Sequence, residues 1–162
     1  MLVGYEREFF VFEHGCVAEA TVDRRYRDKS SRWKRGYLVE ARGCPGSTPA
    51  IALSAYEKAL YTLKNLVENK RQTLFLAAEL PTKRGIIPAG FHVHFGLRAG
   101  EDAQAFVRAL ETHFGGLIAR YKRDVEPKFA LEKKPWGFEF RRLPATVDPV
   151  ELTKVLSKIW PN

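Results

Sequence analysis

The sequence predicts a single α+β domain whose sheet carries polar residues on one face. Four short stretches alternate apolar residues with a pair of charged residues or histidines, which is typical of β-strands with one apolar face. Two longer stretches space their apolar residues at helical intervals. The chain has 162 residues, 45% of them hydrophobic, which is close to the commonest domain size and sufficient for a core. We therefore expect one domain over residues 1–162.

The first expected strand covers residues 2–12, a stretch rich in aromatic and β-branched residues that also contains Glu6 and Glu8. A carboxylate in such a strand is costly to bury unless a cation or hydrogen bonds compensate. The two glutamates therefore need partners, unless they point to water. A second strand is expected over residues 17–22 and a third over residues 37–42.

Residues 23–36, between the second and third strands, hold seven basic and two acidic residues, with Tyr26 and Trp33 among them. A basic loop that contains aromatic residues can grip phosphates and stack on bases, so this segment is the best argument for nucleic-acid binding. A charge run is more often a solvated hairpin tip. Both interpretations stay open.

Three helices are predicted from their start signals and apolar spacing. Thr48 is the expected N-cap and Pro49 the first residue of a helix that ends near Asn69. A second helix is expected over residues 103–121. A third begins after Asp148, where a capping residue, a proline and a glutamate follow the usual order.

The remaining strands lie between and after these helices. One is expected over residues 73–80, and residues 83–88 connect it to another at residues 90–96. Residues 122–135 are highly charged, and we expect them to be irregular. They lead to a last strand at residues 136–144, where charged and apolar residues alternate again.

The polar pairs of four of these strands could converge, because residues i and i+2 of a strand point the same way. The pairs are Glu6 and Glu8, Glu40 and Arg42, His92 and His94, and Glu139 and Arg141. Carboxylate oxygens suit magnesium or manganese, and manganese tolerates an imidazole. The arginines would supply fixed charge for phosphate oxygens, as phosphoryl transfer requires. The pattern predicts a divalent-metal and phosphate site.

Charge and composition restrict the partners without identifying them. A formal charge of +8 and a pI near 9.6 suit an anionic partner such as nucleic acid, a nucleotide or an acidic substrate. Cys16 and Cys44 lack metal-ligand spacing, so neither a disulfide framework nor structural zinc is expected. The sequence shows no signal-peptide pattern and no apolar run near 20 residues. We expect a soluble cytoplasmic protein that has no membrane partner.

The order of the motifs resembles that of the glutamine synthetase superfamily, and more closely the small phage and bacterial carboxylate–amine ligases (amidoligases) related to it. That family carries Glu-x-Glu before aromatics, a glutamate on a central strand, Gly-x-His-x-His, and Glu-x-Arg shortly before a proline. This sequence keeps the order in Tyr5-Glu-Arg-Glu-Phe-Phe, Val39-Glu-Ala-Arg, Gly90-Phe-His-Val-His and Phe138-Glu-Phe-Arg-Arg-Leu-Pro. The resemblance implies a curved, mainly antiparallel β-sheet with helices packed on one face, like a minimal glutamine synthetase catalytic domain.

The resemblance also implies an ATP-dependent enzyme that uses Mg²⁺ or Mn²⁺. The implied metal ligands are Glu6, Glu8, Glu40, His92 and Glu139. Of these, Glu6, His92 and Glu139 would hold the metal beside the transferred phosphoryl group, and Glu8 and Glu40 would hold a second metal. The implied catalytic and phosphate contacts are Arg141, His94 and Arg42, and the implied nucleotide-binding residues are Lys134, Trp136, Arg141 and His94. For Trp136, an ordinary core or rim position is the alternative.

The implied reaction joins a carboxylate to an amine through an acyl phosphate, giving an amide or isopeptide bond. Both substrates would be small molecules or peptides. Thr48 stands where the family has a further glutamate, which leaves Glu79 or a water to complete the second metal site. Gly96 stands where the family has a serine, and the family's closing N-terminal domain has no counterpart here. A homo-oligomer could therefore complete the site.

Two other functions stay open. One is a non-enzymatic nucleic-acid-binding protein on a degenerate ligase scaffold, which would use the basic segment 23–36 and show strong salt dependence. The other is a metal-dependent phosphohydrolase, which would share the metal-binding face but need no amine.

Overall fold

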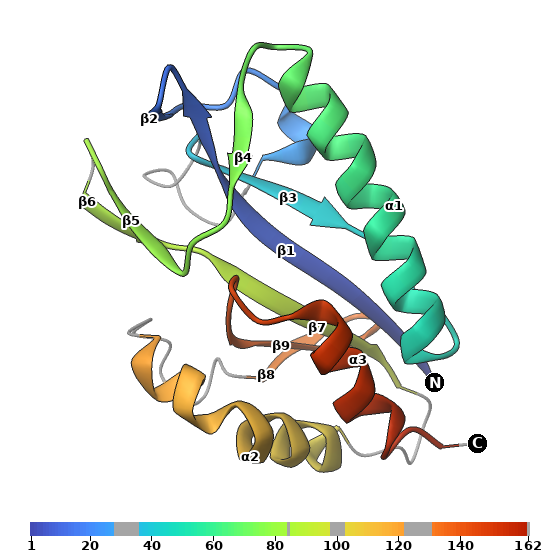
Figure 1. Ribbon diagram of the computed structural model, residues 1–162. Coiled ribbons are helices and arrows are strands. Elements are labelled where there is room, and N and C mark those ends of the chain that lie inside the picture. Colours follow the sequence, from blue (N-terminus) through green and yellow to red (C-terminus); the bar gives the residue numbers. More distant parts are fainter. Residues whose placement is uncertain (28–35, 84, 98–102, 122–130, 162) are drawn as a thin grey trace.

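The computed structural model describes residues 1–27, 36–83, 85–97, 103–121 and 131–161 (Figure 1). Within these residues the fold is α+β, with one main antiparallel sheet, a separate two-stranded sheet and three α-helices. The elements are β1 (Leu2–Glu13), β2 (Cys16–Ala18), the 3₁₀ helix η1 (Arg24–Tyr26), β3 (Leu38–Arg42), α1 (Pro49–Glu68), β4 (Thr73–Phe75), β5 (Glu79–Thr82), β6 (Gly85–Pro88), β7 (Gly90–Gly96), α2 (Gln104–Arg120), β8 (Leu131–Lys134), β9 (Gly137–Pro144) and α3 (Pro149–Ser157). No helix in the described ranges is long and apolar enough to cross a bilayer.

The long strand β1 organises the main sheet. Its first half pairs with β7, its middle pairs with β3, and its last residues pair with β4 and β2. The sheet continues from β7 to β9 and then to β8, and every pairing is antiparallel. The four strands with the predicted polar pairs are therefore neighbours, in the order β3, β1, β7, β9. This confirms the predicted α+β class and mainly antiparallel sheet.

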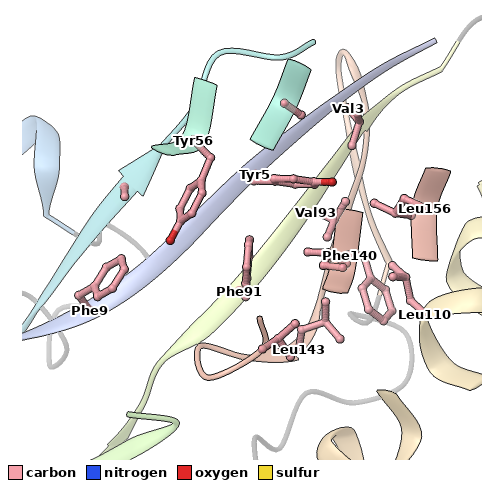
Figure 2. Packing of buried hydrophobic residues seen from close by; sticks show 14 of the residues in the cluster. Val3, Tyr5, Phe9, Tyr56, Phe91, Val93, Leu110, Phe140, Leu143 and Leu156 are labelled. Atoms are coloured by element: carbon pink, nitrogen blue, oxygen red, sulfur yellow. The ribbon is translucent and has the colours of Figure 1, made fainter. Parts of the chain in front are cut away.

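All three helices pack on one face of the main sheet. In Figure 1, α1 runs alongside β1 and β3 and α2 packs near β9, whereas α3 contacts both α1 and α2. The core between the helices and the sheet contains the alternate β1 residues Val3, Tyr5 and Phe9 (Figure 2). Phe91 on β7 lies edge-on to Tyr5, with ring centroids 5.9 Å apart. Because successive strand residues face opposite ways, the intervening residues Gly4, Glu6 and Glu8 are directed away from the helices.

A buried arginine fastens this core to the loop before α3. The Arg7 guanidinium donates to Val147 O at 3.0 Å, to Tyr56 Oη at 3.2 Å and to Ala145 O. It also lies over the Phe91 ring, 5.3 Å from the centroid. The sequence pattern assigned no role to Arg7. Its partners on the loop are carbonyl oxygens, so their positions could not be inferred from side-chain chemistry.

The expected start of the first long helix is confirmed. Thr48 Oγ1 accepts a hydrogen bond from Ile51 N at 3.3 Å, and Pro49 is the first helical residue. The preceding loop lies directly against α1, since a Cβ on Gly43 would lie 2.6 Å from Tyr56 N. The loop between β3 and α1 therefore needs glycine for its close approach to the helix.

Four sequence-based expectations were wrong. Residues 85–88, expected to belong to a connection, form strand β6. The strand expected over residues 73–80 is two elements: β4 pairs with β1, and β5 pairs with β6 in the separate sheet. Residues 131–134, expected to be irregular, form the edge strand β8. In these places backbone pairing to a neighbouring strand, which local sequence does not reveal, decides the structure. Residues 17–22 form a strand only as far as Ala18. Most of the basic segment, residues 28–35, lies outside the described residues.

Candidate metal centre

The strand register brings the predicted polar pairs together on the sheet face opposite the helices. Residues that lie directly opposite each other on adjacent strands have closely spaced side chains on the same face of the sheet. The directly opposed residues are Glu6 with His92, Glu6 with Arg42, Glu8 with Glu40, and Glu139 with His94. A register irregularity in the β7–β9 pairing lies between Phe91 and Val93. Convergence of the four motifs, predicted from the alternation alone, is therefore present in the fold.

Two carboxylates meet at one histidine nitrogen in the middle of this face. His92 Nδ1 lies 3.2 Å from Glu6 Oε1 and 3.2 Å from Glu139 Oε1. The His92 side chain is 2% exposed, and both glutamates are buried. One ring nitrogen carries at most one hydrogen, so Nδ1 cannot make a full hydrogen bond to both oxygens. Neighbouring ligands of an octahedral ion with bonds of about 2.1 Å are themselves about 3 Å apart, which matches this spacing.

The second histidine of the motif lies nearer the opening of the site. His94 Nε2 is 3.3 Å from Glu6 Oε2, and the ring lies against Trp136 with centroids 5.1 Å apart. Ligand atoms of Glu6, His94 and Glu139 all lie within 4.8 Å of one another. Among the described residues, this set of two carboxylates and one imidazole contains His94, whereas His92 Nδ1 contacts the same two carboxylates from within the sheet face. The contact with Trp136 also leaves His94 suited to its predicted role at a nucleotide.

The ionisation of these groups follows from their mutual contacts. Burial disfavours the charged imidazole, but hydrogen bonds to Glu139 and Glu6 outweigh it and raise the pKa of His92 to about 9. Burial would also raise the pKa of Glu139, but His92, Lys134 and Arg141 hold it at about 2. Without a metal, protonated His92 thus offsets one of the two negative charges of Glu6 and Glu139. A divalent cation would replace that proton.

Two permanent cations approach the same carboxylate from β8 and β9. Lys134 Nζ lies 3.0 Å from Glu139 Oε2, and Arg141 Nε lies 3.4 Å from Glu139 Oε1. The turn between the two strands passes through Gly137, which has φ of +148°. A Cβ there would lie 1.8 Å from Phe95 O, so only glycine allows this hairpin to hold Lys134 over Glu139.

Arg42 supplies positive charge on the other side of the face. Its guanidinium contacts Glu6 Oε2 through Nε, and Nη2 lies 2.9 Å from Glu40 Oε2. Burial disfavours the charged form of Arg42, but Glu6 and Glu40 raise its pKa above the usual value. Burial would likewise raise the pKa of Glu6, but His92, His94 and Arg42 hold it well below the normal range. Arg42 remains 61% exposed, so solvent and ligands can reach it.

Glu8 and Glu40, the expected ligands of a second ion, have different surroundings. Glu8 is 1% exposed, and its Oε2 accepts a hydrogen bond from Gly90 N at 2.6 Å. Glu40 lines the pocket, whereas Glu8 is not among the lining residues. Glu79, the expected substitute ligand, is an exposed residue on β5 that does not line the pocket either. Of these three carboxylates, Glu40 alone lines the pocket.

An open pocket of about 560 Å³ lies over this face. Apart from Glu8, every predicted site residue lines it; these are Glu6, Glu40, Arg42, His92, His94, Lys134, Trp136, Glu139 and Arg141. Its volume is in the range of small-molecule sites. The indole of Trp136 is 48% exposed and offers a flat apolar surface at the pocket. The nine residues come from five strands and the turn after β8.

Sequence reasoning missed the small residues that shape the pocket. Gly4, Gly43 and Pro45 also line it. A Cβ on Gly4 would lie 3.7 Å from both Pro45 and the His94 Cβ, so a side chain at this position would project among the pocket residues. Such residues carry no chemical signal. Only their place on the same strand face as Glu6, or in the loop after Arg42, could have indicated them.

Comparisons of the chain with protein-family models, with curated proteins and with solved structures found no match. Arguments about function therefore rest on the geometry of the site and on the motif pattern.

Proposed function

We propose that this protein is an ATP- and divalent-metal-dependent carboxylate–amine ligase of the kind that its motif order resembles. The observation that supports this most directly is the convergence of Glu6, Glu139 and two histidines: His92 Nδ1 lies 3.2 Å from each carboxylate, and ligand atoms of Glu6, His94 and Glu139 lie within 4.8 Å of one another. This group lies in an open pocket that also holds three permanent cations. Binding and activation of a nucleoside triphosphate require this combination of metal ligands and neighbouring cationic side chains.

The donor set fits Mg²⁺ or Mn²⁺. Two carboxylates and one imidazole are hard-to-borderline ligands, and three protein ligands leave positions for phosphate oxygens and water. The bound ion would neutralise charge on the phosphates of ATP. Lys134 and Arg141 lie beside Glu139, where their charge favours the same phosphate group. Trp136 would provide a stacking surface for the adenine.

The proposed chemistry needs no nucleophilic side chain. An oxygen of the substrate carboxylate attacks the γ-phosphorus, and ADP leaves, giving an acyl phosphate. The amine nitrogen then attacks the acyl carbon, phosphate leaves, and the nitrogen loses a proton to form the amide. In the part of the chain that the structure describes, no serine, threonine or cysteine lines the pocket, which agrees with direct transfer between substrates. The acid and the amine are proposed to be small molecules or peptides.

ADP formation tests the proposal. The protein would be incubated with ATP, Mg²⁺ and pools of carboxylates and amines, and ADP would be measured. Release that requires both an acid and an amine is expected. It should disappear in Glu139→Gln and persist in Glu57→Gln, a matched change on the exposed face of α1. A folded protein that forms no ADP with any pool would contradict the proposal, and ADP formation without an amine would indicate a phosphohydrolase.

A further inference from the structure

The two oxygens of Glu6 face different cations. Oε1 lies 3.2 Å from His92 Nδ1, within the proposed metal ligands. Oε2 contacts Arg42 Nε, and the same guanidinium reaches Glu40 Oε2 at 2.9 Å. Arg42 thus bridges the carboxylates of two adjacent strands. Glu6 is shared between the proposed metal and an arginine of the chain itself.

A second divalent ion would need the oxygens that Arg42 contacts. Between β1 and β3, the carboxylates available to such an ion are Glu6, Glu8 and Glu40. Glu8 Oε2 already accepts from Gly90 N at 2.6 Å, and Glu8 does not line the pocket. Arg42 contacts the other two. A further ion at this place would have to displace the guanidinium from both carboxylates.

The charges of the group favour the same conclusion. Four carboxylates, Glu6, Glu8, Glu40 and Glu139, share this sheet face with three permanent cations, Arg42, Lys134 and Arg141. One divalent ion gives this set of carboxylates and cations a single net positive charge. A second ion with Arg42 still present would leave three positive charges within a few ångströms, which is unfavourable in a partly buried site.

We propose that Arg42 is a built-in cation that takes the place of a second metal ion, so that the pocket binds one divalent ion per chain. This inference rests on the proposed metal centre. In this role Arg42 is a positioning residue: it contacts one oxygen of Glu6 and one of Glu40, which fixes both carboxylates and leaves Glu6 Oε1 for the metal. It also keeps a permanent positive charge beside the site of phosphate binding.

The number of bound Mn²⁺ ions tests the inference without any activity measurement. Titration followed by the electron paramagnetic resonance signal of free Mn²⁺ counts ions per chain. The wild-type protein should bind one. Arg42→Met removes the charge but keeps an extended side chain, and it should bind two, with an exchange-coupled spectrum because Glu6 would bridge them. Arg42→Lys keeps a cation and should bind one. Arg25→Met, at a mostly exposed arginine of η1, is the matched control and should also bind one.

Each other outcome has a distinct meaning. Two ions in the wild type, or one in a folded Arg42→Met protein, would overturn the role of Arg42. No ion in the folded wild type would instead overturn the metal centre itself. Circular dichroism checks the fold of each variant. If Arg42→Met does not fold, the Glu40→Gln variant tests the inference instead. It should still bind one Mn²⁺ ion, because the inference pairs Glu40 with Arg42. Loss of the ion would show that Glu40 is a metal ligand and would contradict the inference.

Discussion

Two charged side chains on opposite faces of β1 differ in whether a ligand could replace their partners. Arg7 is directed toward the helices and donates to two backbone carbonyls and the Tyr56 hydroxyl, all of them fixed by the fold. Glu6, the preceding residue, faces the pocket and contacts the His92 imidazole and the exposed Arg42. A ligand cannot replace the partners of Arg7, but in the proposed centre a metal would replace the proton of His92. Polar burial on one face thus stabilises the fold, and on the other face it would serve the proposed binding site.

The largest effect is expected for Arg7→Met. It leaves two buried carbonyls without their donor, so the free energy of unfolding should fall by about 3 kcal/mol, measured by urea denaturation. The folded fraction should still bind Mn²⁺ with unchanged affinity, because Arg7 does not reach the pocket face. A loss of Mn²⁺ binding in folded Arg7→Met protein would break the distinction between the two faces.

Glu139→Gln should show the converse pattern. Replacing one ligand of the proposed ion should weaken Mn²⁺ binding about 100-fold, equivalent to about 2.7 kcal/mol. The same change should lower the free energy of unfolding less than Arg7→Met does. Isothermal titration calorimetry and urea denaturation give the two values. Unchanged Mn²⁺ affinity would remove Glu139 from the metal centre.

The pH dependence of metal binding sharpens the comparison further. Because the pKa of His92 is about 9, the ion must displace a proton, and affinity should rise about tenfold per pH unit from pH 7 to 9. Calorimetry in buffers of different ionisation enthalpy would detect the released proton. If the affinity for Mn²⁺ did not change with pH over this interval, metal binding would not displace a proton from His92.

Stability of the metal-free protein should change in the opposite sense. The raised pKa of His92 contributes stability that is complete below its unfolded value of 6.5 and is lost as pH rises through about 9. The lowered pKa of Glu139 contributes stability above 4.5 that is lost as pH falls toward about 2. The thermal midpoint should therefore be highest between about pH 4.5 and 6.5. A midpoint that still rises from pH 7 to 9 would contradict the contacts of His92.

The smallest effect is expected for Trp136→Ala. If the indole stacks on adenine, ATP affinity should fall by about 1 kcal/mol, while Mn²⁺ binding without nucleotide stays unchanged. Tyr61→Ala, at an aromatic residue of α1 that is 69% exposed, is the matched control. Equal ATP affinity in both variants would leave Trp136 as a rim residue.

The sequence predicted the pocket face well because strand alternation is a local property. His92 and Glu139 each sit between apolar residues, and Glu6 follows Tyr5 and alternates with Glu8, so their common direction needed only the i, i+2 rule. Their pairing across three strands then followed from a single sheet. The same rule placed Glu8 in the pocket, although its hydrogen bond with Gly90 N buries it. Sharing a face does not guarantee access to the pocket on it.

The helix-facing side was harder to predict where it depends on distant backbone atoms. Arg7 binds carbonyls 138 and 140 residues away, and no side-chain pattern marks those positions. Strand β8 has the same difficulty, because its pairing with β9 defines it and its own residues do not alternate. Long-range contacts of the backbone were therefore the part of the fold that local chemistry could not reveal.

Anomalous scattering from a crystal soaked with Mn²⁺ and ATP tests the metal centre most directly. The predicted result is one Mn²⁺ ion bonded to Glu6, His92 and Glu139, with the triphosphate beside Lys134 and Arg141. A crystal that binds no ion on this face, or an ion held without Glu6 and Glu139, would contradict it.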